Sequence, residues 1–344
     1  MNARARTAKN ASAIAEAFSS RDAQAVVKQL ETIEREGGDG TLRVAPRRTL
    51  HVSSLDKVFF PESKITKGDL MRYYASVASV LLPTIKDRPL ILKRYPNGIK
   101  GPSFFQQNAG EHLPSGVRTA SIKTESGAPA ERIIGGDLLT LLYTVQIGTI
   151  AVHAWQSRVR SSHYADTTTI DLDPGDRVPF KSVVRLATLI KQELDDLGLV
   201  AGVKTSGSSG IHIVLPLPAR TPFAIAGAVA EAIAQRVARR NPKLATVERS
   251  LSARPRGSIY VDAQQNSAGK SVVAAYSVRE RSAATVSAPL KWTELRDALR
   301  LDTFTVKTMP IRLRKVGDLW GAAMSRRNSK RALDRALRET SDGR

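Results

Sequence analysis

The sequence predicts an α+β protein whose second half folds as a β-α-β-β-α-β unit, the arrangement of ferredoxin-like and RRM-like domains. Three observations carry this prediction. Residues 167–173 are rich in β-branched side chains and stop at Pro174, which is typical of a strand. Residues 181–197 have a helical pattern that ends at Gly198, a common residue after a helix. Residues 206–210 form a glycine-bearing turn between two apolar strands.

The other elements of the second half follow from similar patterns. Strands are expected at 199–205 and at 211–217, where apolar residues occupy the odd positions of the second segment. Pro222 favours the first turn of a helix over 221–240. A short strand at 258–262 completes the unit, and a further helix is expected at 292–300.

The first half predicts a mixed α/β region. Thr66 is a suitable N-cap for a helix over 67–82. Strands are expected at 88–95 and 150–155, with a helix at 135–142 between them.

Composition limits the classes of function. The 344 residues carry 53 Lys and Arg against 32 Asp and Glu, a formal net charge of +21. There is no cysteine, which excludes disulfides, thiol nucleophiles and cysteine-ligated metals. No apolar run is long enough for a membrane span, and the first residues lack the apolar core of a secretory signal. We expect an intracellular protein that binds a polyanion, nucleic acid before anionic membrane, although the charge also fits a role in solubility alone.

The two ends of the chain differ from its middle. Residues 1–47 are rich in Ala, Arg and Lys and predict a basic arm. This arm is expected to be disordered or to carry a helix over 13–36, with Ser12 as its N-cap. The compact domain is expected over 48–322, and residues 323–344 form a basic C-terminal tail that is helical or disordered.

Two aspartates stand at the end of the predicted strand 167–173. Asp171 and Asp173 are two residues apart, so on a strand their side chains point to the same face. Such carboxylates repel each other unless a cation lies between them, and Mg²⁺ and Mn²⁺ prefer oxygen ligands. Asp262 ends the strand expected beside this one, and three carboxylates there would form a two-metal site for nucleotidyl transfer. Two simpler interpretations stay open: a solvated strand end for the pair, and a turn-forming role for Asp262.

The turn at 206–210 is built from small residues. Consecutive backbone N–H groups in such a turn bind phosphate. Ser206 opens the turn, Lys204 precedes it, and His212 follows it with a side chain that points away from the apolar face of its strand. We therefore predict a phosphate site here, with a plain hairpin turn and an exposed histidine as the alternative.

Basic residues are spread through the central region, and about half of them are expected to be ordinary solvated charges. The candidates for phosphate contact are Lys57, Lys67, Lys93, Arg94, Lys100, Arg254, Arg256, Arg279 and Arg281. Phe104 and Phe105 lie in a turn-rich segment and suit stacking on bases. At least one of these two phenylalanines is expected to lie in the core instead.

With these residues in view, the chain resembles the polymerase domain of bacterial ligase D. That domain is a member of the archaeo-eukaryotic primase-polymerase superfamily and serves non-homologous end joining with Ku. The resemblance covers about residues 49–320. It rests on the ordered segments LDKVFFP (55–61), TKGDL (66–70), KRYPNG (93–98), SFF (103–105), DLDPG (171–175), KTSG (204–207), YSVR (276–279) and PLKW (289–292).

The resemblance implies a primase-polymerase core and a role for each matching residue. The carboxylates implied to bind two Mn²⁺ or Mg²⁺ ions are Asp171, Asp173 and Asp262. The residues implied to bind the nucleotide are Ser206, His212, Arg279, Arg281 and, near the sugar, His153. Lys57 and Lys67 match lysines that hold the 5′-phosphate at a gap or break, and Phe104 and Phe105, beside Lys93 and Arg94, match aromatics that abut the template strand.

The sequence departs from the family pattern in the phosphate turn. The family usually has S-G-x-K-G, and Ser209 stands here in place of the lysine. We expect weaker nucleotide affinity, or a transfer of the phosphate contact to Lys204 or Lys270. No K-x-D-G motif is present, so the chain lacks a ligase nucleotidylation lysine of that kind.

The expected function is that of a metal-dependent nucleotidyltransferase that adds ribo- or deoxyribonucleotides to a 3′-hydroxyl at gapped or broken DNA ends. Its implied partners are DNA ends with a 5′-phosphate, nucleoside triphosphates, Ku and an ATP-dependent DNA ligase, in the bacterial cytoplasm at the nucleoid. Two other functions stay open. One is a catalytically weak module that binds DNA ends and recruits repair proteins, and the other is a primase that starts chains without a primer.

Overall fold

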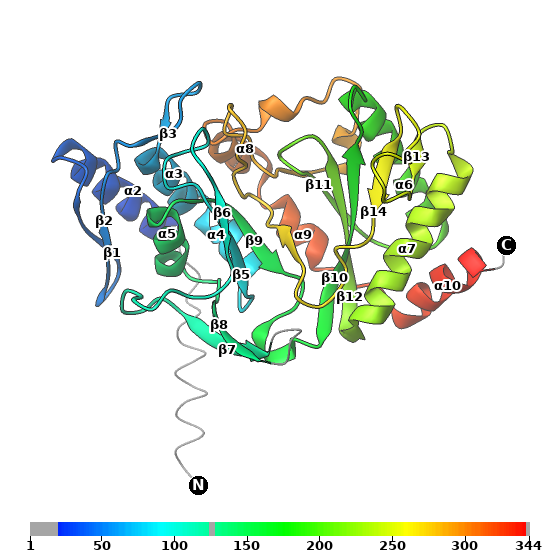
Figure 1. Cartoon of the computed structure of the whole chain (residues 1–344), viewed down its shortest axis with the longest axis horizontal. Coiled ribbons are helices and arrows are strands. Elements are labelled where there is room, and N and C mark those ends of the chain that lie inside the picture. Colours follow the sequence, from blue (N-terminus) through cyan, green and yellow to red (C-terminus); the bar gives the residue numbers. More distant parts are fainter. Residues whose placement is uncertain (1–19, 124–127, 342–344) are drawn as a thin grey trace, which may run out of the picture.

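Two β-sheets, one from each half of the chain, organise the computed structural model, which describes residues 20–123 and 128–341 (Figure 1). The larger sheet has six strands in the order β13-β14-β10-β12-β11-β16. The second sheet has four strands in the order β15-β9-β5-β6. Helices pack on both, so the fold is α+β, as the sequence predicts.

The six-stranded sheet contains the predicted β-α-β-β-α-β unit. Its elements are β10 (Tyr164–Pro174), α6 (Phe180–Asp196), β11 (Gly202–Thr205), β12 (Ile211–Pro222), α7 (Phe223–Arg240) and β14 (Ile259–Asp262). Strand β10 pairs antiparallel with both β12 and β14. Two short strands extend the sheet at its edges and were not predicted: β13 (Ala245–Thr246) and β16 (Pro289–Leu290).

The face of β10 is set by strand alternation. Ile170 and Leu172 are fully buried on the side of the sheet that α6 and α7 cover (Figure 1). Asp171 and Asp173 therefore point to the opposite face. The turn after β11 approaches β10 closely, because a Cβ on Gly210 would lie 2.0 Å from the carbonyl oxygen of Leu172. Only glycine fits at that position.

The smaller sheet belongs mainly to the N-terminal half. Its strands are β5 (Leu90–Arg94), β6 (Phe104–Gln106), β9 (Thr149–Trp155) and, from later in the chain, β15 (Ser271–Val273). Two-stranded ribbons lie beside it, formed by β3 (Val58–Phe60) with β4 (Ile65–Thr66) and by β7 (Thr119–Lys123) with β8 (Pro129–Ile133). The helices of this half are α3 (Lys67–Ser76), α4 (Ala78–Ile85) and α5 (Leu138–Gln146).

The predicted helix over 67–82 is correct at its start and wrong as a single helix. Thr66 caps α3, and it forms a capping box with Asp69. Val77 then interrupts the helix and starts α4. Pro83 lies inside α4, where it cannot donate to the carbonyl oxygen one turn earlier, but this missing bond falls within α4 and not at Val77.

The packed part of the chain begins before the expected boundary at residue 48. Helix α2 (Ser20–Arg35) ends just before Gly37 and Gly38, as predicted, and strands β1 (Gly40–Ala45) and β2 (Arg48–Val52) pair beside it. Leu30 and Leu42 are fully buried, so these elements contribute to the core rather than forming a separate arm. Ser12 and the first residues of the predicted helix lie outside the described residues.

The C-terminal region contains a helix within the tail at 323–344 that was expected to be helical or disordered, but it lacks the helix expected before that tail. The helix predicted at 292–300 is wrong: only the 3₁₀ turn Trp292–Glu294 forms, because Trp292 donates to the carbonyl oxygen of Ala201 and Glu294 pairs with Arg312. A second 3₁₀ turn, Leu301–Thr303, follows. The chain then forms α8 (Met309–Val316), α9 (Leu319–Met324) and α10 (Lys330–Ser341).

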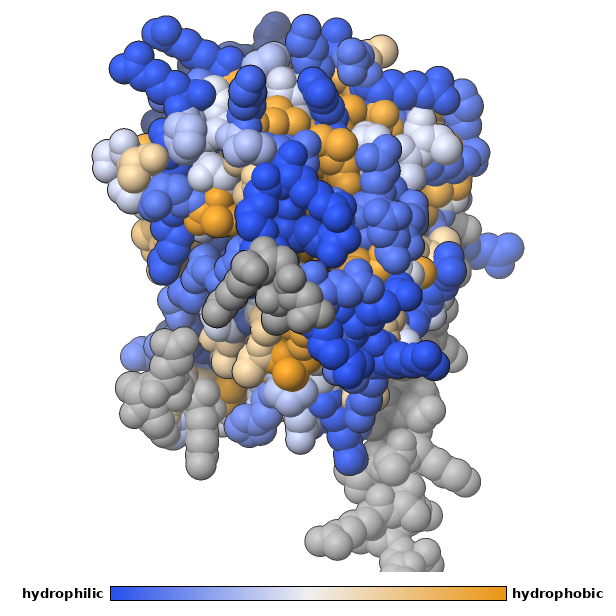
Figure 2. Space-filling view, turned by 90° about the vertical axis from the view of Figure 1, so that its right-hand side faces the viewer, coloured by the Kyte–Doolittle hydropathy of each residue, from blue (hydrophilic) through white to orange (hydrophobic). Residues whose placement is uncertain are grey.

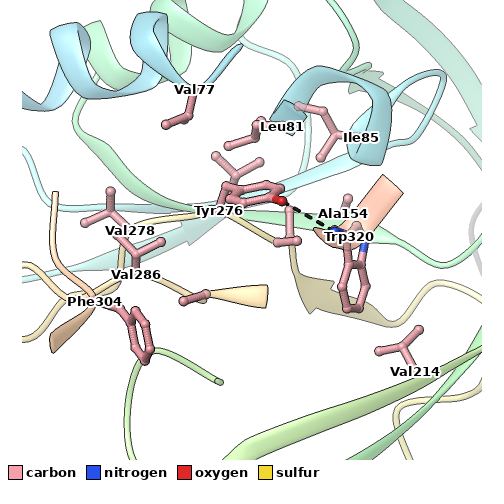
Figure 3. Close-up of a cluster of buried hydrophobic side chains, with 14 of the residues drawn as sticks. Val77, Leu81, Ile85, Ala154, Val214, Tyr276, Val278, Val286, Phe304 and Trp320 are labelled. Carbon is pink, nitrogen blue, oxygen red and sulfur yellow. Dashed lines mark hydrogen bonds between the residues drawn. The ribbon is translucent and has the colours of Figure 1, made fainter. Parts of the chain in front are cut away.

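The two halves meet in a continuous apolar core. Figure 3 shows Val77, Leu81 and Ile85 of the N-terminal half gathered around Tyr276. The hydroxyl of Tyr276 donates to Asp318 at 2.6 Å and accepts from the backbone N–H of Trp320 at 3.5 Å. Within the described residues, no helix has both the length and the apolar character needed to cross a bilayer.

Candidate active site

Three aspartates and a histidine meet at one end of the six-stranded sheet. Asp171 on β10 lies directly opposite Asp262 on β14, and on its other side directly opposite His212 on β12. Asp173 follows on the same face of β10, opposite Tyr260. The strand register thus brings together residues that are up to 91 positions apart in the sequence.

The carboxylates have different surroundings. Burial, with a further contribution from Asp173 and Asp262, raises the pKa of Asp171 to about 7. Burial also raises the pKa of Asp173, although Arg254 lies 3.8 Å away and opposes the shift. Asp262 accepts hydrogen bonds from the backbone N–H of Gln264 at 2.7 Å and from the side chain of Gln265 at 3.3 Å. It therefore also forms the turn that the simpler interpretation expected.

The donor chemistry of this cluster fits a divalent cation. The groups are hard carboxylate oxygens, and burial, followed by the charges of Asp173 and Asp262, raises the pKa of Asp171, so a cation placed among them would favour its ionised form. In the described part of the chain, however, no three acidic or histidine side chains converge into a ready ligand cage. Asp262 and Asp173 turn to Gln264 and Arg254 instead, and a bound cation would have to replace these contacts.

Lys204 is buried and connects to the carboxylate cluster through His212. Only 1% of its surface is exposed, and its ammonium donates to Nδ1 of His212 at 2.9 Å and to the hydroxyl of Ser287 at 2.8 Å. His212 in turn places Nε2 3.3 Å from Asp171. Burial lowers the pKa of Lys204 to about 7 and, with the nearby Lys204 charge, lowers the pKa of His212 well below its usual value. In this arrangement the Lys204 ammonium is directed to His212 and Ser287, and its contact with phosphate stays a prediction.

The phosphate turn is closed by its own serine and by two arginines. The hydroxyl of Ser206 accepts from the backbone N–H groups of Ser208 at 3.1 Å and Gly210 at 3.0 Å. Arg279 donates to the carbonyl oxygen of Ser206 at 2.9 Å, and Arg281 donates to the hydroxyl of Ser208 at 2.9 Å. Both arginines lie at the turn as expected, and each donates a hydrogen bond to it.

His153 reaches the site from the second sheet. It lies on β9, partly exposed, with Arg279, Glu280, Lys204 and Lys93 as its charged neighbours. Removal from water and then the charge of Arg279 lower its pKa to about 4, so the imidazole is neutral near pH 7. A neutral ring suits a contact to a sugar hydroxyl rather than to a phosphate.

The two lysines expected to hold a 5′-phosphate lie together at the N-terminus of α3. The backbone N–H of Lys67 donates to the carbonyl oxygen of Lys57 at 2.8 Å. The side chain of Lys57 donates to Asn97 at 2.8 Å. Burial, and then the charge of Lys57, lower the pKa of Lys67. Two ammonium groups at a helix N-terminus attract an anion.

Phe104 and Phe105 form an exposed aromatic edge on β6. Their exposed fractions are 48% and 64%, so the expectation that one lies in the core is wrong. Lys93 and Arg94 on β5 pair with them across the strands and lie 5.7 Å and 5.1 Å from the ring centres of Phe105 and Phe104. Lys93 also pairs with Glu280 at 3.1 Å. The two aromatic rings thus lie beside the two cations, as the sequence predicted, and their stacking on bases stays a prediction.

Sequence reasoning missed three residues at this site. Tyr260 stacks with Arg254 at 4.0 Å, beside Asp173. Glu280 forms ion pairs with both Lys93 and Arg279. These two cations hold the pKa of Glu280 at about 2, although burial alone would raise it. Ser287 supports Lys204. Tyr260 was detectable because it shares a strand face with Asp262, whereas Ser287 carries no local signal.

A cavity of about 190 Å³ lies behind the site, between the two sheets. Lys204 reaches it, but Asp171, Asp173 and Asp262 do not line it, and Val214, Ala154 and Trp320 give it an apolar wall. The carboxylate cluster therefore lies outside this cavity.

Comparison with known proteins agrees with this geometry. The family described as "LigD, primase-polymerase domain" matches residues 66–320. The "Multifunctional non-homologous end joining protein LigD" of Mycolicibacterium smegmatis is 34% identical over 250 residues, which cover 72% of this chain and 32% of that protein. The "Bifunctional non-homologous end joining protein LigD" of Bacillus subtilis is 33% identical over 269 residues, covering 78% and 43%. The chain thus spans well under half the length of these relatives.

A solved structure extends the likeness to three dimensions. The "Polymerase Domain from Mycobacterium tuberculosis Ligase D in complex with DNA" superposes with a TM-score of 0.75 and 32% identity, over 81% of this chain and 99% of that one. The chain therefore belongs to the LigD primase-polymerase domain family, a family of metal-dependent nucleotidyltransferases.

Proposed function

We propose that this chain adds ribo- or deoxyribonucleotides to a 3′-hydroxyl at gapped or broken DNA ends, as part of double-strand break repair by non-homologous end joining. The observation that carries the proposal is the register that sets Asp171 between Asp262 and His212, with the phosphate turn at the end of the same sheet. A nucleotidyl-transfer site needs carboxylates and a triphosphate cradle at this spacing.

Asp171, Asp173 and Asp262 are the residues that would hold two Mn²⁺ or Mg²⁺ ions. When bound, such ions lower the pKa of the attacking hydroxyl and stabilise the charge of the departing pyrophosphate. The chain supplies the rest. The hydroxyl of Ser206 and the Nε2–H of His212 donate to the triphosphate, and Arg279 and Arg281 hold the turn and add positive charge beside it.

The DNA is held at two further places in this proposal. Lys57 and Lys67 bind the 5′-phosphate on the far side of the gap, which sets the distance between the two ends. Phe104 and Phe105 stack on the template strand, and Lys93 and Arg94 support them. The solved relative is a complex with DNA, which supports this assignment.

The wider setting follows from the same proposal. The relatives are named for non-homologous end joining, so we place Ku and an ATP-dependent DNA ligase as partners of this chain. The site of action is then chromosomal DNA in the bacterial cytoplasm.

The test is incorporation on a gapped duplex with a downstream 5′-phosphate, comparing Mn²⁺ with Mg²⁺ and ribo- with deoxyribonucleotides. We expect templated addition that falls when the 5′-phosphate is removed. A parallel reaction on an unprimed template distinguishes a primase from an enzyme that needs a primer, because only a primase would make product on that template. DNA binding with no incorporation would favour the end-binding module, with Ser209 as the first residue to restore to lysine.

A further inference from the structure

Helix α10 carries buried apolar side chains on one side and exposed arginines on the other. On α10, Leu333 and Ala336 are buried, while Arg331, Arg335 and Arg338 are exposed. The three arginines follow an i, i+4, i+7 spacing, which places them in one line on the opposite side of the helix from the buried pair. We call these three residues the α10 basic stripe.

This helix is held firmly against the rest of the protein. The side chain of Asn328, just before α10, donates to the carbonyl oxygens of Val200 and Pro216, both at 2.9 Å, and accepts from the N–H of Val200 at 2.8 Å. Arg335 donates to the carbonyl oxygen of Asp196 at the end of α6 at 3.3 Å. The α10 basic stripe is therefore presented by a fixed scaffold, so little conformational entropy is lost when it binds a partner.

The end of α7 adds to the positive charge. Glu339 lies 3.7 Å from Arg236 of α7, so the two helices meet at this point. Arg239 is exposed one turn along α7 from Arg236. Among the nearby carboxylates, Glu193 binds Arg236 and Arg240, and Glu339 lies 3.8 Å from Arg335, whereas Asp334 on α10 is exposed beside the stripe. In the part of the chain that the structure describes, no ion pair joins Arg239, Arg331 or Arg338 to a carboxylate.

This surface lies away from the catalytic site. Helices α6, α7 and α10 are on the side of the six-stranded sheet opposite to Asp171, at the right of Figure 1. Figure 2 faces that side and shows it largely hydrophilic. Helix α10 also lies outside residues 66–320, the part of the chain that the family model matches.

We propose that the α10 basic stripe, together with Arg239, is a second contact surface for the phosphate backbone of duplex DNA. Seven residues of helix separate Arg331 from Arg338, a distance of about 10 Å, which is the rise of about three base pairs. A protein partner would need an apolar anchor. Among the described residues, no exposed large hydrophobic side chain lies on α10 or on the last turn of α7. Charge without an apolar anchor fits a polyanion.

The test compares two triple variants that each remove three positive charges. The first is R239Q/R331Q/R338Q, which leaves Arg335 in place because it binds the end of α6. The control is R21Q/K28Q/R43Q, three exposed residues on α2 and β1. Fluorescence anisotropy measures the affinity of each for a blunt 30-base-pair duplex over a range of salt concentrations, without nucleotide or metal. Thermal melting checks that both variants fold.

We expect the stripe variant to lose at least tenfold in affinity near 0.1 M salt. Each phosphate contact contributes about 0.9 to the slope of log affinity against log salt, so the slope falls by about 2.7. The control variant keeps the slope of the wild type, and R239K/R331K/R338K restores it. Equal losses in the stripe and control variants, or a stripe variant that keeps the affinity and salt slope of the wild type, overturn the proposal.

The outcome is independent of the proposed catalytic function. Incorporation on a short primer–template at saturating DNA concentration stays at the wild-type rate in the stripe variant, because none of the three arginines is near Asp171. A wild-type protein without incorporation would contradict the catalytic proposal alone, since the binding measurement needs no chemistry.

Discussion

The ammonium of Lys204 and the imidazole of His212 form a buried hydrogen bond of 2.9 Å to Nδ1. When Lys204 is protonated, its ammonium can only donate, so in that state Nδ1 accepts and Nε2 carries the hydrogen. This hydrogen points toward Asp171, 3.3 Å away. Lys204 thus fixes the tautomer of His212 and makes it a neutral donor at the face where the triphosphate binds.

We predict that Lys204→Met raises the KM for the nucleotide about 10- to 100-fold, the range typical of residues that orient a functional histidine. Without the ammonium, the hydrogen moves to Nδ1 in part of the molecules and the donor at the site is lost. The ¹⁵N shifts of the His212 ring report the tautomer directly. Ser287→Ala is the matched control, because it removes the other acceptor of Lys204 and keeps the bond to His212. An unchanged tautomer with an unchanged KM would show that Lys204 only fills space.

Asp171 makes the metal-free protein less stable at high pH. Its pKa in the folded protein is raised to about 7, so the folded state binds this proton more tightly than the unfolded chain does. The stabilising contribution is complete below about pH 4 and is lost as the pH rises to about 7. With 31% of the side chain exposed, we allow about 2 kcal/mol for this loss.

Asp171→Asn removes this ionisation. In buffer with a chelator, we therefore expect the variant to melt several degrees above the wild type at pH 8 and at the same temperature at pH 4.5. Adding Mn²⁺ at pH 8 raises the melting temperature of the wild type and has a smaller effect on the variant. Scanning calorimetry measures both. A variant that melts below the wild type at pH 8 would mean that the carboxylate already has a stabilising partner in the protein.

The stimulation of synthesis by a downstream 5′-phosphate depends on Lys57 and Lys67. Lys67→Ala leaves Lys57 as the only ammonium at the N-terminus of α3, so the preference for the phosphorylated gap over the hydroxyl gap falls at least tenfold. Lys64→Ala, an exposed lysine three residues away, is the control and keeps the preference. Primer extension on both gaps gives the ratio, and a preference retained in Lys67→Ala contradicts the assignment.

Template binding depends on the exposed ring of Phe105. Because the ring is 64% exposed, Phe105→Ala costs little stability. The affinity for a template overhang falls by about 1–3 kcal/mol, the usual value of one stacked base. Ile311→Ala, which removes another exposed apolar side chain on α8, leaves the affinity unchanged. Fluorescence anisotropy with a recessed duplex measures this affinity. An affinity of Phe105→Ala equal to that of the wild type would contradict the stacking role.

Local sequence signals were sufficient for the catalytic half and for the carboxylates. The β-branched run ending at Pro174 and the glycine turn at Gly210 are short-range features, and the strands that they define follow from alternation. The pairing of Asp171 with Asp262 then follows from the order of strands in the β-α-β-β-α-β unit.

The features that the sequence did not predict depend on contacts between residues far apart in the chain. Leu30 and Leu42 sit in a basic, alanine-rich segment, and only their burial against later elements makes that segment part of the core. The sequence pattern around Lys204 predicts an exposed cation on a strand. In the structure Lys204 is buried, and Ser287, 83 residues later, accepts a hydrogen bond from its ammonium. Neither contact can be predicted from the residues adjacent to it in the sequence.

The central claim is that Asp171 belongs to a metal-dependent nucleotidyl-transfer site, and single-nucleotide incorporation on a primer–template tests it most directly. The rate is measured with Mn²⁺, with Mg²⁺ and with a chelator, for the wild type and for Asp171→Asn at equal DNA occupancy. We expect incorporation to need a divalent ion and to fall at least 1000-fold in the variant while DNA affinity is kept. Incorporation by Asp171→Asn within tenfold of the wild type would contradict it.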